Sequence, residues 1–190
     1  MARPPEGGTR EPAPPINSRR MYQLLKRTNA KWFKQAGYTA HGSSGVWWKA
    51  LEKDLMLDLL FQADKNGWSW DGNRFTLNFR LTDMREKNVP LLQCRFGKLV
   101  DGAADGDVWI ALTNRIVAKL QNVKQPPLYD WELPEYRESD MEPARWFSAA
   151  NDPWMRFYEE EDITMWWAEF LEPRMDSMLR RFLSLPRREL

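Results

Sequence analysis

The sequence predicts an α+β fold, in which a mainly antiparallel sheet of four to five strands packs against N-terminal and C-terminal helices. Two patterns indicate this class. Between Leu51 and Leu81, apolar and polar residues alternate with period two in two arms joined by a polar link. Such alternation is typical of a half-buried hairpin. On both sides of this hairpin, in residues 19–36 and 154–182, apolar residues recur at helical spacing.

The two arms of the hairpin bring their large apolar side chains onto one face if they pair in a suitable register. The register we predict sets Phe61 opposite Phe75, Leu59 opposite Leu77, and Leu57 opposite Phe79. The link, residues 63–73, contains Asn66-Gly67 and Asp71-Gly72, which are strong turn signals. On the other face this register sets Asp58 beside Asn78, Gln62 beside Arg74, and Met56 beside Arg80.

Upstream of the hairpin, residues 1–17 are expected to form a disordered tail, because five Pro and two Gly leave almost nothing apolar to bury. Asn17 or Ser18 then caps an amphipathic helix over residues 19–36, which ends at Gly37. A first strand is expected over residues 46–51, with Trp47 and Trp48 on opposite faces.

Downstream of the hairpin, the pattern predicts a fourth strand at 91–99, a turn at 101–107, a short fifth strand at 108–112, and a helix capped by Thr113. Residues 125–151 are expected to form an irregular, acidic, Trp-rich insertion. A helix should start at Asp152 and Pro153, and Pro173 should break or kink it. Residues 18–184 would then form a single domain, followed by a tail at 185–190.

The formal net charge is +1, which argues against a globally basic nucleic-acid binder, but the charge is unevenly distributed. Residues 17–37 hold six Lys or Arg and no acid, whereas residues 130–162 hold eleven acids and three Arg. Such asymmetry is compatible with a charged partner or with solvated surfaces. Cys94 is the only cysteine, and no long apolar run or signal peptide is evident, so we expect a cytoplasmic protein without membrane contact.

No catalytic, metal or cofactor motif is apparent. His41, the only histidine, would have to serve Ser43, Ser44 or Cys94 as the base, yet it lies in a Gly-Ser-rich turn. The spacing of Asp101, Asp105 and Asp107 lacks the glutamate that ends a calcium-binding loop. Carboxylate chemistry remains open because acids are abundant, as in the run from Glu159 to Asp162.

Several short motifs resemble the bacterial Domain of Unknown Function 4304 family over about residues 19–120. They are Trp32-Phe33-Lys34-Gln35-Ala36-Gly37-Tyr38, Leu60-Phe61-Gln62, Phe75-Thr76-Leu77-Asn78, Arg95-Phe96-Gly97-Lys98-Leu99 and Asp107-Val108-Trp109. The resemblance implies a small bacterial α+β domain and transfers no catalytic residue. The acidic stretch after Lys124 departs from the family's pattern.

We therefore expect a non-catalytic module that binds another macromolecule, most simply a protein, with no cofactor. A defence or immunity role is one form of this expectation, and it comes from the small size of the domain rather than from a motif. The alternatives are a carboxylate-dependent hydrolase-like enzyme and a nucleic-acid binder that uses the basic first helix. The candidate binding residues are Arg74, Asn78 and Arg80, which share one face of the second hairpin strand and suit carboxylate or phosphate groups.

Overall fold

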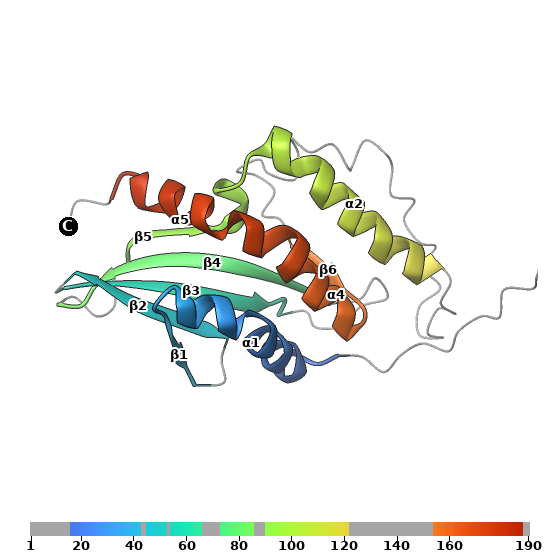
Figure 1. Cartoon of the computed structure of the whole chain (residues 1–190), viewed down its shortest axis with the longest axis horizontal. Coiled ribbons are helices and arrows are strands. Elements are labelled where there is room, and N and C mark those ends of the chain that lie inside the picture. Colours follow the sequence, from blue (N-terminus) through green and yellow to red (C-terminus); the bar gives the residue numbers. More distant parts are fainter. Residues whose placement is uncertain are drawn as a thin grey trace, which may run out of the picture.

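A computed structural model describes residues 16–42, 45–52, 54–65, 73–85, 90–121 and 154–187. It confirms the α+β class: within these residues, helices pack against a six-stranded antiparallel sheet (Figure 1). The strands are β1 (Thr39–His41), β2 (Val46–Glu52), β3 (Leu55–Ala63), β4 (Asn73–Asp83), β5 (Pro90–Arg95) and β6 (Met155–Phe157). Their order in the sheet is β1-β2-β3-β4-β5, and β6 also pairs with β4.

The described helices occupy three parts of the chain. Near the N-terminus lies α1 (Ser18–Gln35), and in the middle lie the 3-10 turn η1 (Phe96–Lys98) and α2 (Gly102–Gln121). A C-terminal run follows, which consists of α4 (Glu160–Met165), the π-helical η3 (Trp166–Leu171), the 3-10 turn η4 (Glu172–Arg174) and α5 (Met175–Ser184). In Figure 1, α1 and the run from α4 to α5 lie on the same side of the sheet, and α2 lies beyond the run.

Helix α1 confirms the expected first helix. The Asn17 side chain accepts a hydrogen bond from the backbone N–H of Arg20 at 2.9 Å, which satisfies one of the free N–H groups at the helix start. After the helix, Gly37 turns the chain at φ +82°, a conformation that side chains with a Cβ disfavour. The buried face of the helix consists of Met21, Leu24, Leu25, Asn29 and Phe33.

An aromatic cluster joins α1 and the C-terminal run to one face of the sheet, which we call the inner face. Phe33 of α1 stacks on Trp47 of β2 with ring centroids 4.7 Å apart. Trp167 of η3 lies 5.6 Å from Phe33 and 6.4 Å from Phe61 of β3. Further along the sheet, Phe182 of α5 lies 5.5 Å from Phe79 of β4. Aromatic rings contribute large buried areas, so these contacts fix where the helices sit.

The hairpin of β3 and β4 forms as expected, but the predicted register is wrong by two residues. Leu59 pairs with Phe79 instead of Leu77, and Phe61 pairs with Leu77 instead of Phe75. Because the shift is two residues, the large apolar side chains still share the inner face. Two ion pairs distinguish the registers: the observed one sets Asp58 beside Arg80 and lets Arg74 reach Asp64.

The predicted turn at 101–107 and strand at 108–112 are also wrong, because α2 begins at Gly102 and runs through both. The aspartates that suggested a turn act at the helix start. The Asp101 side chain accepts a hydrogen bond from the backbone N–H of Ala104, and the Asp105 side chain accepts one from the N–H of Asp101 at 2.7 Å. This reciprocal arrangement resembles a capping box and stabilises the first turn.

The helix expected to begin at Asp152 starts later, and its first residues form β6 instead. Met155 and Phe157 are both fully buried, while Arg156 between them is partly exposed, which is the period-two pattern of a strand. Phe157 lies opposite Asn73 of β4, and its ring is 5.9 Å from Phe75. Residues 152 and 153 lie outside the described residues.

The C-terminal run departs from α-helical geometry around Pro173, as expected. Proline has no N–H, so the carbonyl of Glu169, four residues earlier, loses its usual donor. Arg174 compensates: its Nη1 donates to the carbonyl oxygens of Glu169 at 3.3 Å and Phe170 at 3.0 Å. The π-helical and 3-10 turns that precede α5 are therefore supported by side-chain hydrogen bonds.

Parts of the predicted domain plan lie outside the described residues. These parts are 1–15 of the expected tail, the acidic segment 125–151, and 188–190 at the end of the chain. Of the expected N-terminal tail, Ile16 is buried against the core and Asn17 caps α1. Leu185, expected in the C-terminal tail, packs against the core while partly buried.

We predict that Leu59→Ala lowers the free energy of unfolding by about 2–5 kcal/mol, because it removes a fully buried side chain and leaves a cavity. Chemical denaturation measures this change. Leu183→Ala, at an exposed position on α5, is the control and should change stability by less than about 0.5 kcal/mol. Equal midpoints for the Leu59 variant and the wild type would contradict the burial of this strand.

A second prediction concerns Asn29, which is fully buried and whose amide makes no hydrogen bond to the described residues. Asn29→Leu should raise the free energy of unfolding by about 1–3 kcal/mol, because an apolar side chain of similar size avoids the cost of desolvating the amide. Asn114→Leu, the same change at an exposed position on α2, is the matched control. A lower midpoint for the Asn29 variant would show that this amide has a hydrogen-bond partner in solution.

Candidate functional site

The face of the sheet opposite the helices, which we call the outer face, carries the candidate binding residues. Strand pairing places Trp48, Asp58, Arg80 and Gln93 in one row across four strands, and Val46, Leu60, Asn78 and Arg95 in the next. The side-chain hydrogen bonds of Asn78 and Arg80 run to the neighbouring strand β3 rather than to a helix. The described helices thus pack on the inner face, but Asp58, Thr76, Asn78 and Thr82 of the outer face are buried as well.

Arg80 and Asp58 form an ion pair on the outer face, in the row that contains Trp48. The Nε and Nη2 of Arg80 lie 2.8 Å and 2.7 Å from the same carboxylate oxygen of Asp58. The Asp58 side chain is 3% exposed, whereas that of Arg80 is 39% exposed. Asp58 therefore depends on Arg80 for the neutralisation of its buried charge, and part of the guanidinium remains open to solvent.

The other two candidates are also bound within the hairpin. Arg74 donates to Asp64 from Nη2 at 2.6 Å and from Nε at 3.0 Å. The Nδ2 of Asn78 donates to the Oε1 of Gln62 at 3.0 Å. The three residues share one face, as the sequence predicted. Asp64 and Asp58 partly neutralise the two arginines, and Asn78 is buried and hydrogen-bonded to Gln62. Their role in binding stays a prediction.

Sequence analysis placed Trp48 opposite Trp47 but did not assign it to the candidate site. Trp47 is 2% exposed on the inner face, whereas Trp48 is partly exposed on the outer face. Val46 and Leu60, which pair directly across β2 and β3, are partly exposed beside it. The outer face therefore has an apolar centre next to the Asp58–Arg80 pair. The signal that could have identified it was the tryptophan on the polar side of an alternating strand.

Trp154, the residue before β6, lies beside β5 at one edge of this face. The guanidinium of Arg95 lies over the Trp154 ring, 4.9 Å from its centroid, which is a cation–π contact. Arg95 occupies the same row as Asn78. An arginine and a tryptophan thus lie at the β5 end of this row, and Val46 lies at its other end.

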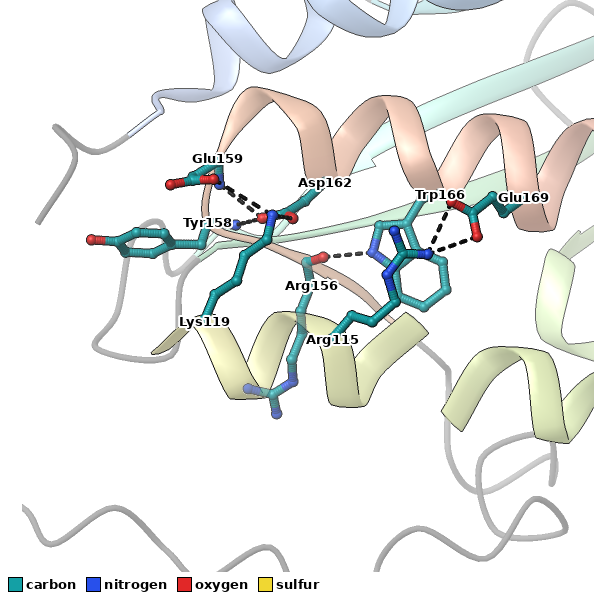
Figure 2. A network of polar contacts seen from close by, with 8 residues as sticks. All are labelled: Arg115, Lys119, Arg156, Tyr158, Glu159, Asp162, Trp166 and Glu169. Atoms are coloured by element: carbon teal, nitrogen blue, oxygen red, sulfur yellow. Dashed lines mark hydrogen bonds and ion pairs between the residues drawn. The ribbon is translucent and has the colours of Figure 1, made fainter. Parts of the chain in front are cut away.

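A second polar cluster lies between α2 and the C-terminal run (Figure 2). Asp162 is fully buried, and its Oδ2 accepts hydrogen bonds from the backbone N–H groups of Tyr158 and Glu159, each at 2.8 Å. Its Oδ1 accepts from Lys119 of α2 at 2.6 Å. Burial alone would lower the pKa of Lys119, but the bond to Asp162 and the charges of Asp162 and Glu159 outweigh it and raise the pKa.

Other contacts of this cluster also join α2, β6 and the C-terminal run. Arg115 of α2 donates from Nη1 to both carboxylate oxygens of Glu169, at 3.0 Å and 2.8 Å. The indole N–H of Trp166 donates to the backbone oxygen of Arg156 at 2.6 Å, and burial lowers the pKa of the Arg156 guanidinium to about 10. Figure 2 shows Lys119 and Arg115 extending from α2 to these groups. The cluster fastens α2 to the run and to β6, which is a structural role.

The buried carboxylates within the described residues are all paired with cations. They are those of Asp58, Asp83 and Asp162. Hydrogen bonds from Arg85 lower the pKa of Asp83, and the hydrogen bond from Arg20 lowers that of Glu160, so both stay ionised at neutral pH. A general acid requires the opposite shift.

Of the other catalytic candidates, His41 and Cys94 lie apart, and Ser43 and Ser44 lie outside the described residues. His41 ends β1 and Cys94 belongs to β5, and these strands are four spacings apart in the sheet, or about 19 Å. Cys94 is buried, which raises the pKa of its thiol to about 11. Asp101 and Asp105 serve the start of α2, and Asp105 also pairs with Arg174 at 2.6 Å. The described residues contain no group of His, Cys, Asp and Glu suited to a metal ion.

We predict that Arg80→Gln lowers the free energy of unfolding by about 1–3 kcal/mol, because it leaves the Asp58 carboxylate buried without its cation. The double variant Asp58→Asn with Arg80→Gln should lose less, since neither side chain is then charged. A double-mutant cycle from chemical denaturation measures the coupling. Additive effects of the two single substitutions would show that the pair is not formed in solution.

A further prediction concerns the Cys94 thiol, whose raised pKa keeps it protonated and unreactive at pH 8. Ellman's reagent should modify native Cys94 at least tenfold more slowly than the same thiol in denaturant. Modification at equal rates in the two conditions would place Cys94 outside the core.

Within the described residues, no helix combines the length and the apolar character needed to cross a bilayer. Comparisons of the chain with models of protein families, with curated proteins and with solved structures found no match. The resemblance to the Domain of Unknown Function 4304 family accordingly stays a prediction from short motifs.

Proposed function

We propose that this chain is a non-catalytic binding module that holds another protein on its outer face, in the cytoplasm of a bacterium. The observation that carries the proposal is the position of Trp48. This residue is partly exposed beside Leu60 and the Asp58–Arg80 pair, on the face that the aromatic cluster does not use. Trp and Arg are the residue types that dominate the binding energy of protein interfaces.

The apolar and charged parts of the face suit different parts of an interface. Val46, Trp48 and Leu60 would supply an apolar centre, and Arg74 and Arg80 would lie at its polar rim. Both arginines are oriented by carboxylates of the hairpin, so little side-chain entropy is lost when a partner accepts their remaining N–H groups. Asn78, between them, is held by Gln62.

Binding is favoured over hydrolysis because the buried carboxylates already have cations. Asp58, the one on the outer face, is buried and bound by Arg80, so its charge is neutralised within the sheet and is not available to a substrate. A defence or immunity role would be one biological use of such a module. Its support is limited to the size of the domain.

The experiment is affinity capture from the source cells with the purified wild-type chain and variants, followed by quantitative mass spectrometry. Trp48→Ala should reduce the captured partner at least tenfold, because truncating a central interface tryptophan costs more than about 2 kcal/mol. Leu183→Ala, which removes an exposed apolar side chain from α5, is the control and should capture the wild-type amount.

Because Trp48 is partly buried, its variant could lose stability as well as binding. The double variant Asp58→Asn with Arg80→Gln therefore provides a second test, since it removes both charges of the ion pair together and leaves no buried charge unpaired. Melting curves establish that each variant is folded. A partner captured equally by the wild type, the Trp48 variant and the double variant would exclude the outer face as the binding surface.

A further inference from the structure

The exposed side of α1 carries a stripe of positive charge, which we call the basic stripe. Its cations fall within roughly 140° of the helix circumference, counting about 100° per residue. They are Arg19, Arg20, Lys26, Arg27, Lys31 and Lys34, all exposed, and α1 contains no acid. One of them, Arg20, is paired with a carboxylate, that of Glu160 at 2.6 Å. Lys26 donates to the backbone oxygen of Gly42, a contact that leaves its charge uncompensated.

The composition of the basic stripe indicates what kind of partner fits it. Protein interfaces rely on buried aromatic or aliphatic side chains and are depleted in lysine. The large apolar side chains of α1, such as Met21, Leu25 and Phe33, are buried against the core instead. For the same reason the helix has no apolar face to insert into a membrane. A partner held by charge alone has to carry regularly spaced negative charges.

We propose that the basic stripe binds the phosphate backbone of duplex nucleic acid without sequence preference. The 18-residue helix is about 27 Å long, and a duplex presents one phosphate per about 1.7 Å of its axis. Long, flexible lysine and arginine side chains on such a helix reach several phosphates. Because α1 packs on the inner face, this contact leaves the outer face accessible, and the two surfaces act independently.

The net charge of +1 limits the strength of this contact, so we expect a dissociation constant of about 10⁻⁵ M at 50 mM salt. This is weaker than typical non-specific binding, whose dissociation constants are about 10⁻⁴–10⁻⁶ M at the higher, physiological salt concentration. The test is fluorescence anisotropy of a labelled 20-base-pair DNA of mixed sequence, titrated with the full chain. For four neutralised phosphates, raising the salt from 50 to 100 mM should weaken binding about 12-fold. A second duplex of unrelated sequence should bind equally well.

The stripe variant combines Arg27→Glu, Lys31→Glu and Lys34→Glu and should abolish binding. Its matched control combines Lys98→Glu, Arg180→Glu and Arg187→Glu, three exposed cations outside α1, so that both proteins undergo the same change in net charge. Because Glu near a helix C-terminus is unfavourable, a version with Gln at the three stripe positions confirms the result, and melting curves establish that every variant is folded.

Loss of DNA binding in the stripe variants, with less than a threefold change in the control, supports the proposal. The absence of DNA binding by the wild type at 50 mM salt would overturn it, as would equal losses in the two sets of variants. Parallel titrations use phosphatidylserine vesicles and polyglutamate. Binding to either of these polyanions without binding to DNA would also overturn it. Trp48→Ala should bind DNA like the wild type, so failure of the outer-face proposal is detected separately.

Discussion

The pairing of β3 with β4 is the contact on which the rest of the molecule depends. The two strands present an unbroken row of large apolar side chains on one face, and each packing unit on that face uses a different part of the row. Phe61 contacts rings of α1 and η3, Phe79 contacts a ring of α5, and Phe75 contacts a ring of β6. Burial of these rings is the main favourable contribution to the packing of the helices. Without the row, the helices would have no common surface.

Placing the aromatic cluster on one face leaves the other face to polar and charged side chains. There the hairpin uses ion pairs at positions where the register matters. Desolvation makes the buried Asp58 carboxylate a weak source of net stability, even with Arg80 beside it. Its contribution lies in selecting the register, since a slip of two residues preserves the apolar row but separates Asp58 from Arg80. The same arrangement leaves a fixed arginine in the row that contains the partly exposed Trp48.

Local patterns in the sequence were sufficient for α1, β2 and the hairpin, whose period and capping signals are unambiguous. They were insufficient where two structures share one local pattern. The register failed because a two-residue slip keeps every side chain on its face, and only long-range charge pairing separates the alternatives. The second half of α2 was expected as a helix capped by Thr113, but its first half was missed, because aspartates such as Asp101 and Asp105 occur both in turns and at helix starts. Strand β6 was missed because three residues are too few to show a period, and because its pairing with β4 spans about 80 residues.

For the candidate site, period two was enough to place Arg74, Asn78 and Arg80 on one face, because alternation is a property of a single strand. Their partners could not be predicted, since these depend on the register. The sequence shows the cations of the basic stripe, but it does not show that Glu160 pairs with Arg20 and interacts electrostatically with Arg27, because the packing of α4 on α1 brings this carboxylate to the stripe. Residues distant in the chain thus decide how much of a charged surface remains available.

The central claim is that the helices cover Trp47 on the inner face of the sheet and leave Trp48 on the outer face partly exposed, and the oxidation of these adjacent tryptophans tests it directly. Hydroxyl-radical footprinting with peptide-level mass spectrometry measures the oxidation of Trp47 and Trp48 in the native chain. With Trp47 2% exposed on the inner face and Trp48 partly exposed on the outer face, the structure predicts oxidation of Trp48 and protection of Trp47. Equal protection of both residues, or preferential oxidation of Trp47, would contradict the account.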